Sequence, residues 1–168
     1  MNTVHGGQYP KLVELSNPVR KLYKIRYDIS YDKDSNNYIY QEENFVGKPT
    51  IDMIRDTIYS YYNLLAKNEI QTGFKYGGTG EESTVWLSTE NQFNYKAAYD
   101  LAVQTNGFTL PYTIIEGLYD NPNKITFTTL SDFKVFYVAM MNFINTTLEE
   151  YRYKKESVDF EKYKELLK

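Results

Sequence analysis

Few residues of this chain have the side chains that catalysis or metal binding usually requires. Its 168 residues include one histidine, His5, and no cysteine. His5 precedes Gly6-Gly7 in a polar segment, where nothing in the sequence would fix the tautomer or position of an imidazole. Proton transfer and metal ligation both need such support. We therefore expect no role in catalysis for His5, and no Ser-His pair.

Adjacent carboxylates occur three times in the chain. The pairs are Glu42-Glu43, Glu81-Glu82 and Glu149-Glu150. A glycosidase needs two carboxyl groups that face each other across about 5–10 Å. Adjacent residues point to opposite faces of a strand, or diverge by about 100° on a helix, so these pairs indicate solvated surface. The sequence predicts that the protein is not an enzyme and has no catalytic, cofactor-binding or metal site.

The loop Gly77–Glu82 is rich in glycine, but no Lys-Ser or Lys-Thr follows it. It also joins two expected strands rather than a strand and a helix, so it predicts a flexible hairpin loop rather than a phosphate-binding loop.

Trp86 stands between Val85 and Leu87 on an expected strand. An indole can stack on a sugar ring, so Trp86 is a possible glycan platform. The sequence favours the alternative, a buried indole whose N–H meets a backbone carbonyl.

Aromatic residues are abundant, with 18 Tyr, 9 Phe and 1 Trp. Tyrosine provides rigid contact area with a polar end, which suits recognition surfaces as well as cores. Several tyrosines lie off the expected apolar stripes of their helices and are candidates for binding a sister subunit or a larger partner: Tyr59, Tyr62, Tyr151 and Tyr153. Scattered exposed aromatics are the alternative interpretation.

Residues 1–20 read as an N-terminal arm, because Gly6-Gly7, Pro10 and Pro18 interrupt this segment. It either is disordered or orders on a partner, and we expect deletion of Met1–Pro18 to leave the domain folded. The residues expected to dock are Gln8, Tyr9, Leu12, Val13 and Leu15.

Charge and hydropathy narrow the classes of partner. The net charge is −3 and the chain has no basic cluster, so we expect no nucleic-acid partner. No signal peptide is recognisable and no run approaches the roughly 20 apolar residues of a membrane span. We expect a soluble protein that is made in the cytoplasm and has no membrane partner.

Periodicity predicts an α+β fold with an antiparallel sheet, helices on one side of it and a repeated ββα layout. A globular domain is expected over 21–156, followed by a short helix in 157–168. Strands are expected at Leu22–Tyr31, Tyr38–Val46, Gly73–Tyr76, Thr84–Leu87, Tyr112–Glu116 and Lys124–Thr128.

Alternation along Leu22–Tyr31 predicts one apolar face and one wet, charged face. Helices are expected over 51–67, from a Thr89 cap to Gln104, and from Thr129 or Ser131 to Tyr153, with Ser157 as a possible cap of the last one. The second of these should bury Phe93, Ala97 and Leu101.

Several segments resemble a family of domains of unknown function from bacteriophages and prophages, often encoded in or beside tail-fibre genes. They are Gly73-Phe74, Val85–Ser88, Glu90–Asn94, Gly107 with Leu110-Pro111, and the Phe127…Phe136…Ile144 spacing. The resemblance covers about half the chain, from Gly73 to about Glu150, and carries no known catalytic or ligand residues.

The resemblance implies a virion structural protein made in the host cytoplasm, such as a head fibre, tail fibre, decoration or adaptor. Its partners would be capsid, tail or fibre proteins, and it would form a homo-oligomer. The alternatives are a fibre-assembly chaperone absent from the mature particle, and a glycan-binding module for host attachment.

Overall fold

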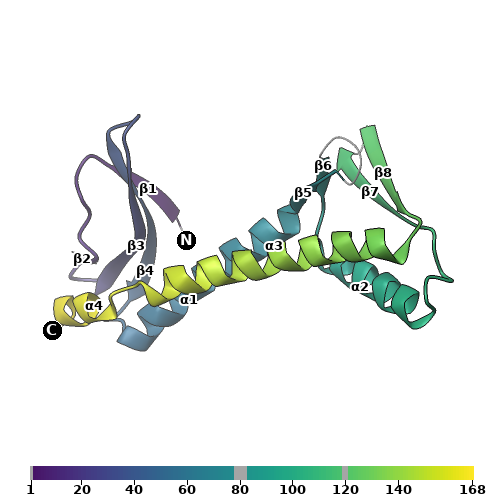
Figure 1. Cartoon of the computed structure of the whole chain (residues 1–168). Coiled ribbons are helices and arrows are strands. Elements are labelled where there is room, and N and C mark those ends of the chain that lie inside the picture. The colour runs from purple at the N-terminus through teal and green to yellow at the C-terminus, as the bar shows by residue number, and fades with distance from the viewer. Residues whose placement is uncertain (1, 78–82, 119–120) are drawn as a thin grey trace. The chain divides into compact units, whose positions relative to one another are not determined.

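The computed structural model describes residues 2–77, 83–118 and 121–168 (Figure 1). It contains two compact units, and the expected domain boundaries at 20 and 156 do not coincide with them. Unit 1 comprises Met1–Tyr61 and Lys155–Lys168, and unit 2 comprises Tyr62–Lys154. Helix α1 (Ile51–Thr72) and helix α3 (Leu130–Glu156) each contribute residues to both units.

The α+β class is confirmed. Two strands precede each of α2 (Thr89–Gln104) and α3, as in the predicted layout, but four strands precede α1. The described strands form three antiparallel sheets rather than one. Unit 1 holds a four-stranded sheet in the order β1-β4-β3-β2. Its strands are β1 (Asn2–Gly6), β2 (Val13–Asn17), β3 (Leu22–Asp32) and β4 (Asn37–Val46).

The interpretation of residues 1–20 as an arm outside the domain is wrong, because this segment supplies both edge strands of the unit 1 sheet. Asn2 to Gly6 pair with Glu42 to Tyr38, and Val13 to Leu15 pair with Ile25 to Tyr23. The glycines and prolines that suggested an arm lie mostly in the connections between strands. Deleting Met1–Pro18 would therefore expose both edges of the β3–β4 hairpin and disrupt unit 1.

The predicted wet face of β3 is also wrong in part. Arg26 and the residue opposite it, Glu42, are both buried. Segment 7–12 covers them, since Lys11 and Leu12 accept hydrogen bonds from the Arg26 guanidinium and backbone N–H. A β-bulge after Tyr27, with Asp28 at φ 51°, ends the simple alternation.

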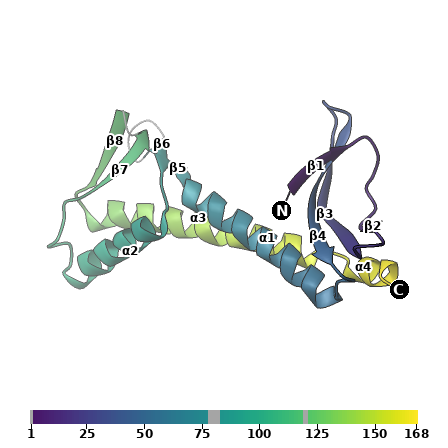
Figure 2. The same ribbon diagram turned by 180° about the vertical axis from the view of Figure 1, so that it is seen from behind.

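The other face of the sheet packs against the first half of α1, as Figures 1 and 2 show. Thr50 caps this helix as predicted, since its hydroxyl accepts the Met53 N–H at 3.2 Å. The apolar residues buried in unit 1 include Ile25, Tyr27, Ile54, Ile58 and Tyr61. Helix α4 (Phe160–Leu166) adds Tyr163, and Asp159 rather than Ser157 caps it.

Unit 2 contains two hairpins, the whole of one helix and parts of two others. Its elements are β5 (Phe74–Tyr76), β6 (Ser83–Val85), α2 (Thr89–Gln104), β7 (Tyr112–Leu118), β8 (Asn121–Phe127) and most of α3. The two hairpins lie side by side through β6 and β7. Thr129 caps α3, as one of the two predicted residues. The predicted glycine-rich loop falls mostly outside the described residues.

The core of unit 2 is rich in phenylalanine. It contains Ile70, Phe74, Val85, Leu87, Tyr95, Ala102, Ile114, Phe127, Phe133, Phe136 and Met140. The rings of Phe127 and Phe133 stack at 4.9 Å. Burial of this apolar surface is the main stabilising contribution to the unit.

Helix α2 differs from the sequence prediction in its cap and in its buried face. Ser88 caps it, one residue before the expected Thr89, and its side chain accepts the Asn91 N–H at 3.1 Å. The helix buries Tyr95 and Ala102, whereas Phe93, Ala97 and Leu101 are exposed. Its predicted end is confirmed, with Asn106 and Gly107 at positive φ.

Candidate functional site

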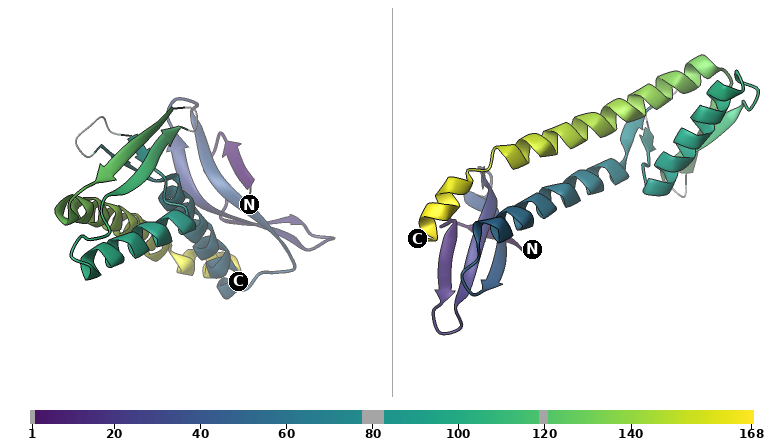
Figure 3. Two further views of the ribbon diagram at one scale, coloured as in Figure 1. Left: turned by 90° about the vertical axis from the view of Figure 1, so that its right-hand side faces the viewer. Right: turned by 90° about the horizontal axis from the view of Figure 1, so that it is seen from below.

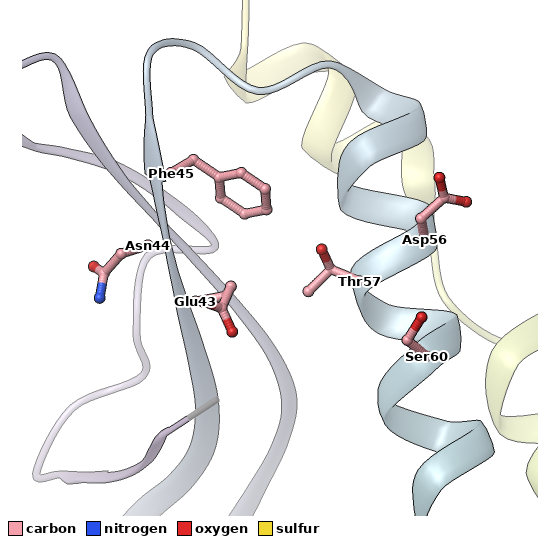
Figure 4. Close-up of a pocket in the computed structure, with 6 residues that line it drawn as sticks. All are labelled: Glu43, Asn44, Phe45, Asp56, Thr57 and Ser60. Atoms are coloured by element: carbon pink, nitrogen blue, oxygen red, sulfur yellow. The ribbon is translucent and has the colours of Figure 1, made fainter.

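A groove in unit 1 lies between strand β4 and helix α1 and has a volume of about 410 Å³. It is lined by Glu43, Asn44 and Phe45 of the strand and by Asp56, Thr57 and Ser60 of the helix, and it opens to solvent (Figure 4). Strand alternation sets its geometry: Glu43 and Phe45 point towards α1, and Asn44 points to the opposite side.

The groove combines acidic, hydroxyl and aromatic groups. The Thr57 hydroxyl donates to the Met53 carbonyl at 2.9 Å, so its proton is used within the helix. None of the six lining residues is a histidine, cysteine or lysine. The groove can therefore accept hydrogen bonds from a polar or cationic group. Its openness suits contact with a surface rather than enclosure of a substrate.

On the opposite face of the same sheet, Arg26 is the centre of a charged network. Its guanidinium donates to Glu42 at 2.8 Å and to Glu14 at 2.5 Å, and Lys24 donates to Glu42 at 2.8 Å. Burial alone would raise the pKa of Glu42, but the hydrogen bonds from Lys24 and Arg26 outweigh it and lower that pKa. Burial alone would lower the pKa of Arg26, but the hydrogen bonds and charges of Glu14 and Glu42 outweigh this effect and raise that pKa. This network joins strands β2, β3 and β4 through the side chains of Glu14, Arg26 and Glu42.

Unit 2 contains one buried acid that the sequence analysis missed. Glu116 on β7 is only 1% exposed, and neither carboxyl oxygen has a hydrogen-bond partner among the described residues. Burial raises its pKa. Burial also raises the pKa of Tyr76, and it raises the pKa of Tyr95 to about 12. The charge of Glu116 makes a smaller contribution to both shifts. The alternation of Tyr112, Ile114 and Glu116 could have revealed it, since these residues share one face.

The residues predicted to dock from the N-terminal segment are spread over the edge of the unit 1 sheet. Gln8, Tyr9 and Leu15 are exposed, whereas Leu12 and Val13 are half-buried. The Tyr9 ring lies edge-on to Tyr38 at 5.5 Å. Tyr9 therefore packs against the sheet, and Gln8, Tyr9 and Leu15 remain accessible.

The prediction of outward tyrosines is wrong for Tyr62 and Tyr151. Both are buried in unit 2, and the Tyr151 hydroxyl donates to Glu69 at 2.8 Å. Tyr59 is half-buried against Phe160 of α4, with ring centres 5.9 Å apart. Tyr153 alone of the four is fully outward, at 75% exposure. The structure therefore does not bring these tyrosines together as one surface.

Trp86 follows strand β6, and it is 45% exposed. The expectation of a buried indole is wrong, because the neighbours Val85 and Leu87 occupy the core instead. An aromatic ring at the surface keeps the glycan alternative open.

The carboxylate pairs diverge as predicted where the structure describes them. Glu42 lies on the Arg26 face and Glu43 in the groove, although Glu42 is buried rather than solvated. Glu149 and Glu150 are exposed on α3 beside Arg152 and Lys154. Glu81-Glu82 lies outside the described residues. Within the described part of the chain, no cluster of three or more metal-binding side chains occurs.

No family model, curated protein or solved structure matches this chain. The resemblance to phage domains therefore stays a prediction based on the residues quoted for it. Of the helices in the described residues, none has the length and apolar character needed to cross a membrane.

Proposed function

We propose that this protein works through protein–protein contacts, as a structural component of a bacteriophage particle. The observation that carries the proposal is the exposure of large apolar side chains around helix α2. Phe93 and Phe108 are 70% and 89% exposed, and Leu101 and Val103 are each close to half exposed. Large apolar side chains that stay exposed along and beside one helix favour an interaction site there.

The open groove between β4 and α1 supports the same proposal. Its carboxylates can accept hydrogen bonds from lysine or arginine side chains of a partner, and the Phe45 ring supplies apolar contact. The placement of the protein in a phage particle rests on the resemblance of Gly73 to about Glu150 to phage domains. The particle position could be a head fibre, a tail fibre, a decoration or an adaptor.

Two alternatives predict different results in simple experiments. A fibre-assembly chaperone would be required for morphogenesis but absent from the finished particle. A glycan-binding module is favoured by one specific observation, the exposed ring of Trp86.

Mass spectrometry of purified virions tests the proposal directly. Recovery of this chain in stoichiometric amounts with capsid or tail proteins would support a structural role. Its absence from particles, together with loss of fibres when the gene is deleted, would favour the chaperone. A glycan array with wild-type protein and Trp86→Ala tests the third function, which requires binding that the substitution abolishes.

A further inference from the structure

Helix α2 has two apolar faces, and its own unit uses only one of them. Helix α2 lies beside helix α3 in unit 2 (Figure 3). Tyr95, Ala98, Tyr99 and Ala102 pack into or against the core, where the Tyr99 ring stacks on Tyr137 of α3 at 4.4 Å. At about 100° per residue, Phe93, Ala97 and Leu101 lie on the opposite side of the helix. All three are exposed. We name these three residues the outer stripe.

We propose that the outer stripe binds the outer stripe of a second copy of this chain, with the two α2 helices antiparallel about a two-fold axis at Ala97. The three positions are spaced i, i+4 and i+8. A two-fold axis at the middle position places Phe93 of each copy against Leu101 of the other, and the small side chain of Ala97 lets the helices approach at the centre.

Charge complementarity supports a second copy as the occupant. Lys96 and Asp100 lie on the same flank of the outer stripe and form an i,i+4 pair within the helix. A lysine that precedes its acidic partner is the weaker orientation for such a pair. In the antiparallel arrangement Lys96 lies within about 3 Å, along the axis, of the level of Asp100 of the other copy, and its side chain leans in that direction.

The remaining polar residues of this face fit the same symmetry. Glu90 and Gln104 are equally distant from Ala97 in the sequence, so the two-fold axis sets a carboxylate opposite an amide rather than opposite another carboxylate. Exposed aromatics also stand beyond both ends of the helix, Trp86 at its start and Phe108 after its end. Antiparallel pairing brings opposite ends of two copies together.

This inference deepens the proposed contact function by naming one partner, and it rests on that function. The sequence predicted Tyr62 and Tyr151 as contacts of a homo-oligomer, but both are buried. The outer stripe takes their place in the proposed contact.

Sedimentation equilibrium of the full chain measures the association. We expect a concentration-dependent dimer whose Kd rises at least about tenfold in Ala97→Glu, because two carboxylates would meet at the axis. Val135→Glu is the matched control, since Val135 is an exposed apolar residue of α3 in the same unit. Circular dichroism verifies that both variants fold. A wild-type monomer at about 100 μM, or equal weakening by both variants, would overturn the inference.

A charge exchange tests the geometry independently. Lys96→Glu and Asp100→Lys should each weaken the dimer, because each sets like charges against each other across the interface. An equimolar mixture of the two variants should regain dimers that contain one chain of each. Failure of the mixture to associate better than either variant alone would contradict the antiparallel arrangement. Virion mass spectrometry is unaffected by these results, so failure of the dimer and failure of the particle role are distinguishable.

Discussion

The Tyr163 hydroxyl donates a hydrogen bond to the backbone carbonyl of Arg26 at 2.7 Å, joining residues 137 positions apart. Tyr163 is buried in unit 1, and this contact attaches the C-terminal helix α4 to strand β3. Arg26 is therefore held through its side chain by Glu42 and Glu14, and through its carbonyl by α4. The N-terminal and C-terminal segments of unit 1 are therefore joined by a direct hydrogen bond.

The first prediction concerns this hydrogen bond. Tyr163→Phe leaves the Arg26 carbonyl without that donor in a buried position and should destabilise unit 1 by about 1–2 kcal/mol. Amide hydrogen exchange along β3 measures the effect. Tyr9→Phe is the matched control, because Tyr9 is 61% exposed in the same unit, and it should change the stability by less than about 0.5 kcal/mol. Equal effects of the two substitutions would show that the contact contributes nothing.

The second prediction concerns Glu42, which two cations contact. Glu42→Gln should cost about 3 kcal/mol at pH 7, because it removes one of the two carboxylates that pair with the buried Arg26 and leaves that charge only partly compensated. Since the folded-state pKa of Glu42 is lowered, its contribution is complete above about pH 4.3 and is lost as the pH falls through the folded-state value. The difference between variant and wild type should therefore shrink in acid.

Hydrogen exchange along β3 at several pH values measures the Glu42 effect. The surface variant Glu161→Gln is its control, because Glu161 lies in the same unit and forms an exposed pair with Lys164 at 3.4 Å. A Glu42→Gln deficit that does not depend on pH would argue against the charged network.

The third prediction has the opposite pH sign. Because burial raises the folded-state pKa of Glu116, the fold is favoured below about pH 4.3, and stability is lost as the pH rises through the raised value. Glu116→Gln removes this loss, so the variant should exceed wild type in stability at pH 8, and the two should differ by at most about 1 kcal/mol at pH 4.

Urea unfolding followed by Trp86 fluorescence measures this difference in unit 2. Glu150→Gln serves as the control, since Glu150 is exposed on α3 in the same unit. A Glu116→Gln variant that loses stability at pH 8 relative to wild type would refute the prediction.

Local patterns in the sequence predicted the elements well but predicted less well which faces they bury. The strand at Leu22, the helix at Ile51 and the end of the helix before Gly107 follow from alternation, a cap and residues that tolerate positive φ. The prediction of the buried face of helix α2 was wrong because two opposite faces of this helix are apolar, and periodicity alone could not identify the buried one. Packing against Phe133, Phe136 and Tyr137 decides that choice, and these contacts are distant in the sequence.

The N-terminal segment and Arg26 show a second kind of limit. Strand pairing between residues 2–6 and 38–42 depends on contacts more than 30 positions apart, which no local window contains. The charges of Lys24 and Arg26 indicated a wet face, but complementary glutamates on two other strands let that face be covered.

The last prediction uses two glycines with nearly the same backbone. Gly47 has φ 85° and Gly73 has φ 90°, so alanine is strained at both positions. A Cβ at Gly47 would meet nothing within 4 Å, whereas a Cβ at Gly73 would lie 1.9 Å from the Val85 carbonyl oxygen. That oxygen belongs to the β6 backbone, which pairs with Phe74 of β5 and cannot move without breaking the hairpin. Gly47→Ala should therefore cost about 1 kcal/mol and Gly73→Ala more than about 3 kcal/mol. Thermal unfolding of both variants, followed by circular dichroism, measures the difference, and similar costs would mean that the β5–β6 hairpin can shift to admit the methyl group.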